Sequence, residues 1–280
     1  MSTAQSQKFA YLGPVGTFTE AALKKITCDS DIKIPYANVT AALDAVRTGD
    51  ADFALVPIEN SVEGVVARTL DELAIGDPLT ISGEVTLPVT FAFMVKVGTQ
   101  DVNRIGTHPH AESQCREYIA HKYPHAEIVP FPSTSAAAEA VSKGAIDAAI
   151  ASSSAAEHFG LEIREADIGD NSGAVTRFIC AQKPGWVPEP TGHDRTSMAV
   201  FIDIDHAGAL LEILQVFAKY DVNLTFIQSR PTGRELGHYH FIIDVEGHIK
   251  DAAVEKSVAE LREICDDIRF LGSYPREVRA

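Results

Sequence analysis

The segment TAALDAVRTGDADFA, residues 40 to 54, predicts an alanine-rich helix that ends near Gly49 and a short apolar strand that follows it. A second segment, SAAAEAVSKGAIDAA at 135 to 149, matches the first at seven of fifteen positions and places Gly144 over Gly49. A repeat of this kind predicts two lobes that share one architecture.

Apolar runs and helix-like segments also alternate on both sides of this repeat. Strand-like runs such as IKIPYA (32 to 37) and DFALVPI (52 to 58) are separated from others by helix-like runs such as TEAALKKIT (19 to 27). This alternation predicts an α/β fold with parallel or mixed sheets that carry helices on both faces.

A change in composition divides the chain. KPGWVPEPTGHDRT, residues 183 to 196, holds three prolines and two glycines and predicts a linker between a domain at 1–182 and a second at 197–280. The pattern of apolar runs in the second domain predicts the element order βαββαβ, which is that of a ferredoxin-like α+β unit. Its expected elements are a strand at 197–203, a helix at 208–221, strands at 222–230 and 238–245 around the turn 231–237, a helix at 250–264 and a strand at 269–273.

Bulk properties exclude several classes of function. With a net charge of -15, the chain lacks the clustered cations that nucleic-acid backbones and anionic membranes require. Its amino terminus has no signal-peptide pattern, and no apolar run reaches the roughly 18 residues of a membrane span. The four cysteines are scattered without a CxxC pair, which is typical of reduced thiols. We expect a cytoplasmic protein with neither nucleic-acid nor membrane partners.

Two stretches place polar residues where a strand gives way to a helix. In GPVGTFTEAA (13 to 22), backbone N–H groups near Thr17 suit a carboxylate or phosphate, although Thr17 can equally be a helix cap. In VPIENSVEGVV (56 to 66), Asn60 or Ser61 can likewise either cap a helix or bind a ligand. If the repeat is real, Glu59, Asn60 and Ser61 face the serines at 152–154 across a cleft, because open α/β sheets bind ligands at these strand ends.

A third stretch, GTHPHAESQC (106 to 115), gathers Thr107, two histidines and Gln114 at another such junction. No third ligand lies at a recognisable metal-site spacing, so the histidines are predicted to cap or to be solvated, with no metal bound.

The fourth stretch, GAVTRFICAQ (173 to 182), sets Thr176 and Arg177 in an apolar strand. Side chains alternate along a strand, so both reach one ligand only if the strand begins or bends near Arg177. An arginine on an edge strand is the alternative.

In this order, the motifs YLGPVGTFTEAA, VPIENSVEGVV, THPHAESQC and the Thr-Arg-Phe of GAVTRF resemble those of the prephenate dehydratase family over nearly the whole chain. GALL and QSRP in the second domain look like the amino-acid-binding motifs of an ACT domain. The resemblance implies a two-lobed, periplasmic-binding-protein-like catalytic domain followed by a regulatory ACT domain. It also implies decarboxylative dehydration of prephenate to phenylpyruvate, without a cofactor.

The resemblance further implies roles for individual residues. Catalytic roles fall to Thr176, Arg177 and Glu59, and substrate contacts to Asn60, Ser61, Thr107, Gln114, Phe178 and Thr17. In the ACT unit, effector contacts fall to Gly208, Ala209, Leu210, Asn223, Leu224, Gln228, Ser229 and Arg230. Phenylalanine is the expected effector, and a homodimer or homotetramer the expected assembly.

Two positions depart from the family pattern. His110 stands where glutamine is common, and Gln228 replaces the glutamate of the ESRP motif, which puts effector affinity in doubt. Arogenate, which has an amino group in place of the keto group, is the nearest competing substrate. A non-catalytic amino-acid sensor with two lobes is the alternative from another class.

Overall fold

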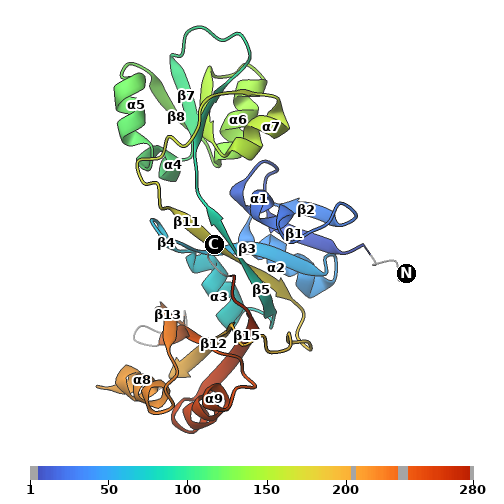
Figure 1. Cartoon of the computed structure of the whole chain (residues 1–280), viewed down its shortest axis with the longest axis vertical. Helices are drawn as coiled ribbons and strands as arrows, with labels where there is room; N and C mark the ends of the chain where they lie inside the picture. The colour runs from blue at the N-terminus through green and yellow to red at the C-terminus, as the bar shows by residue number, and fades with distance from the viewer. Residues whose placement is uncertain (1–5, 203–205, 233–238, 278–280) are drawn as a thin grey trace. The chain divides into compact units, whose positions relative to one another are not determined.

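The computed structural model describes residues 6–202, 206–232 and 239–277. The chain forms two compact units. The first comprises Met1–Ala42, Leu55–Val66 and Val85–Phe178, and the second comprises Leu43–Ala54, Ala67–Glu84 and Ile179–Ala280. The described residues form three sheets (Figure 1).

The first sheet has the strand order β2-β1-β3-β11-β5, with β4 paired to β3. Its parallel β1–β2 pair follows from a helix that connects the two strands in sequence. The elements are β1 (Lys8–Leu12), α1 (Phe18–Lys24), β2 (Ile32–Tyr36), α2 (Val39–Thr48), β3 (Phe53–Asn60), β4 (Gly64–Val65), α3 (Ala67–Ile75), β5 (Thr80–Pro88) and β11 (Val175–Gln182).

The second sheet has the strand order β10-β6-β9-β7-β8. Its elements are β6 (Ala92–Val95), β7 (Arg104–Thr107), α4 (Pro109–Ser113), α5 (Arg116–Lys122), β8 (Glu127–Pro130), α6 (Thr134–Ser142), β9 (Ala148–Ala151), α7 (Ser153–Phe159) and β10 (Glu162–Glu165). All four side chains of β6 are buried, because its two faces pack into different apolar clusters. Helices therefore cover both faces of this sheet, as predicted for an α/β fold.

The internal repeat has a structural counterpart. The repeated segments form α2 with β3 and α6 with β9, and β3 and β9 occupy the same position in the strand order of their sheets. The chain passes from the first sheet to the second after β5 and returns through β11. The predicted two-lobed α/β architecture is thus confirmed.

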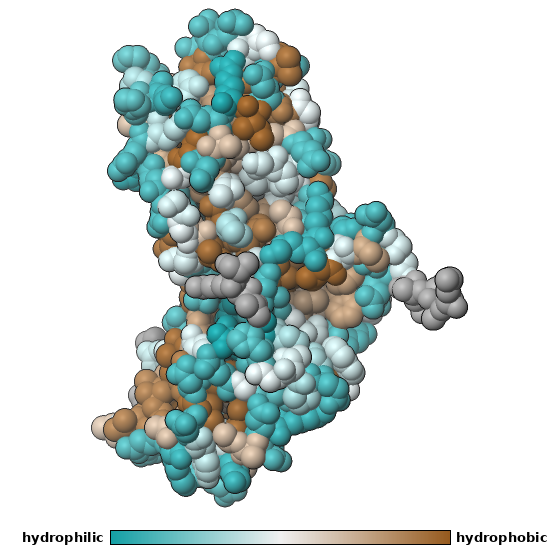
Figure 2. All heavy atoms as spheres, viewed as in Figure 1, coloured by the Kyte–Doolittle hydropathy of each residue, from teal (hydrophilic) through white to brown (hydrophobic). Residues whose placement is uncertain are grey.

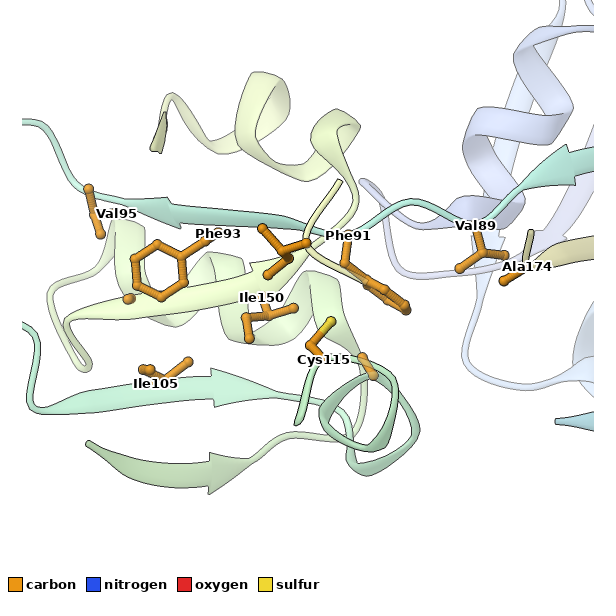
Figure 3. Close-up of a cluster of buried hydrophobic side chains, with 11 residues drawn as sticks. Val89, Phe91, Phe93, Val95, Ile105, Cys115, Ile150 and Ala174 are labelled. Carbon is orange, nitrogen blue, oxygen red and sulfur yellow. The ribbon is translucent and has the colours of Figure 1, made fainter. Parts of the chain in front are cut away.

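The two connecting segments between these sheets are tied to each other. Val89 N–H donates to the Ala174 carbonyl at 2.8 Å. Both residues belong to the buried cluster that continues through Phe91 and Phe93 into the second sheet (Figure 3). Val89 and Phe91 of the first connecting segment also line the cavity described below.

The third sheet has the antiparallel order β13-β14-β12-β15, and its chain order confirms the predicted βαββαβ unit. The elements are β12 (Asp194–Ile202), α8 (Ala209–Lys219), β13 (Leu224–Pro231), β14 (Tyr239–Glu246), α9 (Ala252–Ile264) and β15 (Asp267–Pro275). Residues of α8 and α9 share one apolar cluster with the strands, so both helices cover the same face.

The strand β12 begins at Asp194, near the end of the segment predicted to be a linker. The buried Asp194 carboxylate accepts hydrogen bonds from the N–H groups of Thr191 and Gly192, which fixes the start of the strand. Most of the predicted turn at 231–237 lies outside the described residues. The domain limits at 182 and 197 stay a prediction.

Candidate active site

A cavity of about 1000 Å³ lies in the first compact unit. It is lined by residues that follow β1, β2, β3, β7 and β8, together with the connecting segments near Val89 and Phe91. The carboxyl ends of parallel strands are where open α/β sheets bind ligands. Its wall is largely apolar, and the polar side chains in it include Thr17, Asn60, Glu63, His108, His110, Gln114, Ser133, Thr134 and Thr176.

Thr176 on β11 and Asn60 at the end of β3 form a hydrogen-bonded pair in this wall. Asn60 Oδ1 accepts from the backbone N–H groups of Val62 and Glu63 at 2.8 and 2.9 Å, which fixes the orientation of the amide. Asn60 Nδ2 then donates to Thr176 Oγ1 at 2.8 Å. Among the described residues, Thr176 has no acceptor for its own hydroxyl hydrogen, so this hydrogen is available to a molecule in the cavity.

The neighbouring pair, Glu59 and Arg177, does not line the cavity. Arg177 is buried and its Nε lies 3.4 Å from Glu59 Oε2, while the Glu59 side chain is 41% exposed. Adjacent residues of a strand point to opposite faces of the sheet. As this alternation predicts, Thr176 lines the cavity and Arg177 does not. The proposed grip of Arg177 on a substrate carboxylate stays a prediction.

Gln114 at the end of α4 reaches the turn between β3 and β4. Its Nε2 donates to Glu63 Oε1 at 3.0 Å. His110 Nδ1 lies 3.5 Å from Glu63 Oε2. The predicted residues Gln114, Asn60 and Thr176 therefore share one cavity, and Glu63 connects them.

His108 is the N-cap of α4, where its Nδ1 accepts from His110 N–H. This confirms the predicted capping role, but both histidines also line the cavity. Burial, and then the neighbouring His110, lower the pKa of His108. His108 is therefore a neutral imidazole at pH 7.

Other predicted residues lie outside the cavity lining. Thr107 is buried and donates to the Ile150 carbonyl at 2.8 Å, a bond between neighbouring strands of the second sheet. Ser61 Oγ accepts from Val175 N–H at 2.9 Å, and Phe178 is buried in the protein interior. Their side chains stabilise the framework of the site in this structure.

The serines at 152–154 do not line the cavity, so the structure does not show the expected cleft between them and residues 59–61. Ser152 Oγ donates to the Gly16 carbonyl at 2.9 Å and is buried. Gly16 has a φ of +79°, and a Cβ there would lie 3.2 Å from Ala155 Cα, so this close approach favours glycine. The serine instead positions the loop that leads to Thr17.

Thr17 caps α1, as one of its two interpretations predicts, and it also lines the cavity, where its contact with a ligand stays a prediction. Its Oγ1 accepts from Glu20 N–H at 3.4 Å and donates to the Pro14 carbonyl at 2.9 Å. Glu20 Oε2 accepts from Gly16 N–H at 2.6 Å, so that one N–H group of this loop is already bonded within the protein.

Sequence reasoning missed Glu63, Ser133 and Thr134 as lining residues and did not give His110 a role in the cavity. Ser133 is the N-cap of α6, and its Oγ accepts from Ala136 N–H. The signal was present, because the strand β8 ends beside Ser133 just as β3 ends beside Asn60.

A second, smaller cavity of about 180 Å³ lies in the ACT-like unit. Gly208, with a φ of +102°, is the N-cap of α8, and it lines this cavity together with Ala209 and Leu210. The other predicted effector residues do not line it. They are Asn223, Leu224, Gln228, Ser229 and Arg230. Figure 2 shows apolar surface over α8, where Leu210 and Leu211 are 37% and 57% exposed.

Arg230 has a partner in the second compact unit. Its Nε and Nη2 donate to the two carboxylate oxygens of Asp71 on α3 at 2.9 and 2.8 Å. Gln228 Nε2 donates to the backbone carbonyl of Ser229.

The fold and the cavity define a two-lobed α/β protein with a small-molecule site, joined to a ferredoxin-like unit. A family model described as prephenate dehydratase matches residues 9–185, and one described as ACT domain matches residues 200–263. The chain belongs to the prephenate dehydratase family. None of the described helices is long and apolar enough to cross a membrane.

Individual relatives agree with this assignment. The prephenate dehydratase of Amycolatopsis methanolica is 42% identical over 96% of this chain and 88% of its own length. The crystal structure of prephenate dehydratase from Arthrobacter aurescens, in complex with L-Phe, is 47% identical over 96% of this chain and 90% of its own, with a TM-score of 0.90. GqqA, described as a quorum quenching acylase, is 29% identical over 97% and 98%, with a TM-score of 0.85.

Proposed function

We propose that this protein is a prephenate dehydratase that converts prephenate to phenylpyruvate, carbon dioxide and water. The observation that carries the proposal is the Thr176–Asn60 pair in the cavity wall. Asn60 Nδ2 donates a hydrogen bond to the Thr176 oxygen, so the threonine hydroxyl is oriented to donate its own hydrogen into the cavity. A donor held in this way can stabilise a departing hydroxyl group.

The chemistry of the substrate matches such a wall. Loss of the ring carboxylate and the 4-hydroxyl makes the ring aromatic, so the product supplies the driving force and the enzyme assists departure of hydroxide. A threonine hydroxyl is a weak acid, and its role is therefore to donate a hydrogen bond rather than to lose its proton outright. The apolar wall around Phe18 and Phe91 excludes water and strengthens that bond.

The test is to incubate the purified full chain with prephenate and with arogenate, and to follow phenylpyruvate and phenylalanine. Formation of phenylpyruvate from prephenate is the expected result. Preferential formation of phenylalanine from arogenate would make the chain an arogenate dehydratase. Turnover of neither substrate would favour a non-catalytic sensor.

The likeness to GqqA adds an N-acyl amide as a third substrate in this assay. Amide hydrolysis by a threonine nucleophile requires an adjacent base. In the described part of the cavity wall, Thr176 is bonded to the amide of Asn60, which is not a base. We expect no hydrolysis of the amide.

For the ACT domain, we propose phenylalanine as the effector, as in the complex of the relative from Arthrobacter aurescens. The N-terminus of α8 beside Gly208 suits an amino-acid carboxylate, and Ile202 and Phe241 give the small cavity an apolar side. The exposed Leu211 and Ile227 support pairing of chains at this unit. Calorimetry with phenylalanine and light scattering, both on the full chain, test affinity and assembly.

A further inference from the structure

The charge of the main cavity is unusual for a site that takes a dianion. Among the described residues that line it, none is a lysine or an arginine. The ionisable side chains of its wall that can change charge near neutral pH are His108 and His110, and the wall also carries the carboxylate of Glu63. A dianion entering this wall meets a like charge, which disfavours binding unless a positive charge forms.

Glu63 is held in place from two elements. Gln114 of α4 donates to one of its oxygens at 3.0 Å, and His110 Nδ1 lies 3.5 Å from the other. Its backbone N–H donates to Asn60 Oδ1, the same atom that orients the amide toward Thr176. Glu63 is thus part of the turn that orients the Asn60 amide toward Thr176, and His110 approaches this turn from α4.

The two histidines differ in their surroundings. His108 is half-buried, and burial lowers its pKa, so it resists protonation. The His110 side chain is 67% exposed and faces the Glu63 carboxylate from α4, with His108 as its ring neighbour at a centroid distance of 4.9 Å. An incoming dianion would bring further negative charge beside this exposed imidazole, and such charge favours the protonated form.

We propose that His110, held by Glu63, takes up one proton when the substrate dianion binds, and that this proton leaves in the product water. The inference rests on the proposed dehydratase function. At neutral pH the reaction itself consumes one proton. The C–C bond to the ring carboxylate breaks, which releases carbon dioxide, and the electron pair of that bond enters the ring. The C–O bond then breaks, and the departing hydroxide takes the proton to form water. The Glu63–His110 pair therefore holds the proton that the overall reaction consumes.

The test compares pH profiles of kcat/KM for prephenate between pH 6 and 9. Because both carboxyl groups of the substrate are ionised throughout this range, the profile reports on the protein. For the wild type we expect a fall of about tenfold per pH unit above the range in which histidine ordinarily titrates. His110→Gln should be about tenfold or more below the wild type at pH 6, mainly through KM, and within about twofold of it at pH 9.

Two further variants sharpen the result. His108→Asn keeps the cap of α4 and should keep the shape of the wild-type profile, since burial disfavours the protonated form of His108 and lowers its pKa. Glu63→Gln removes the repelling charge and should lower KM at pH 9 severalfold. If the pH profile of His110→Gln runs parallel to that of the wild type, the inference about His110 is wrong and the proposed function is unaffected. Absence of wild-type turnover at every pH would overturn the proposed function and the inference with it.

Discussion

Two arginines near the start of apolar strands, Arg177 on β11 and Arg195 on β12, have similar sequence surroundings and different partners. Arg177 lies 3.4 Å from a carboxylate whose side chain is 41% exposed. Arg195 lies 3.2 Å from Glu84 and 3.1 Å from Asp244, whose side chains are 2% and 1% exposed. A half-exposed carboxylate such as Glu59 stays in contact with water, whereas a cation between two buried carboxylates is fixed by their desolvation.

The network around Arg195 extends through further buried side chains of the second compact unit. Asp244 Oδ1 accepts from Ser197 Oγ at 2.6 Å, and Ser197 is hydrogen-bonded to Tyr274 at 2.7 Å. These bonds join three strands of the ACT sheet to β5 through Glu84. An arginine of this kind stabilises the fold, and its sequence context alone would not separate it from Arg177.

The largest expected effect comes from Arg195→Met. This change leaves two buried carboxylates without their shared cation and should lower the free energy of unfolding by about 3–5 kcal/mol. Arg177→Met leaves a single, partly exposed carboxylate that water can solvate, and it should therefore cost clearly less than the Arg195 change. Urea denaturation followed by circular dichroism measures both, with transitions of the two compact units fitted separately. Equal losses for the two variants would contradict the distinction drawn between these arginines.

The next effect concerns Thr176, the neighbour of Arg177. Thr176→Val keeps the shape of the side chain and removes the donor, so kcat for prephenate should fall about 10²- to 10³-fold, with a much smaller change in KM. Thr176→Ser restores a hydroxyl and should recover most of the rate. An unchanged kcat in the valine variant would remove Thr176 from the mechanism.

The sequence predicted much of this framework because the relevant signals are local or repeated. The repeat around Gly49 and Gly144 predicted two matching sheets, and the ordered family motifs, several of which follow strand ends, implied that Asn60, Gln114 and Thr176 belong to one site. These signals suffice because the carboxyl ends of parallel strands share one edge of a sheet.

Other features depend on packing that local patterns do not determine. Thr107 belongs to a strand of four residues, too short for alternation to show that its hydroxyl faces Ile150 rather than the cavity. The Glu63–His110 pair joins positions that are far apart in the sequence, and their approach depends on how the second sheet packs beside the β3–β4 turn. Partner exposure, which separates Arg177 from Arg195, likewise exists only in the folded protein.

A smaller effect is expected from His240, which lies in the same sheet as Arg195. It is fully buried, stacks on Phe201 at 5.2 Å, and its ring nitrogens have no hydrogen-bond partner among the described residues. Burial lowers its pKa; the nearby Asp71 opposes this shift, and Arg230 adds to it. Below the ordinary histidine value of 6.5 the unfolded chain therefore binds more protons than the folded one, so stability falls as the pH falls through this range.

The His240→Phe variant tests this pH dependence, since phenylalanine keeps the aromatic stacking and cannot be protonated. Between pH 7 and 5 the variant should lose less stability than the wild type, measured by urea denaturation at each pH. His108 also has a lowered pKa and contributes in the same direction, so a residual slope is expected. Identical slopes for the variant and the wild type would show that His240 does not titrate in this window.

The smallest effect is expected at the Asp71–Arg230 pair, where both side chains are about one quarter exposed. Asp71→Asn should change the free energy of unfolding by about 0–1 kcal/mol, because water replaces much of a partly exposed ion pair. The same variant decides the predicted role of Arg230 in effector binding. If Arg230 binds the phenylalanine carboxylate, it must first leave Asp71, so the variant should bind phenylalanine severalfold more tightly in calorimetry. An unchanged affinity would make Arg230, like Arg195, a structural arginine.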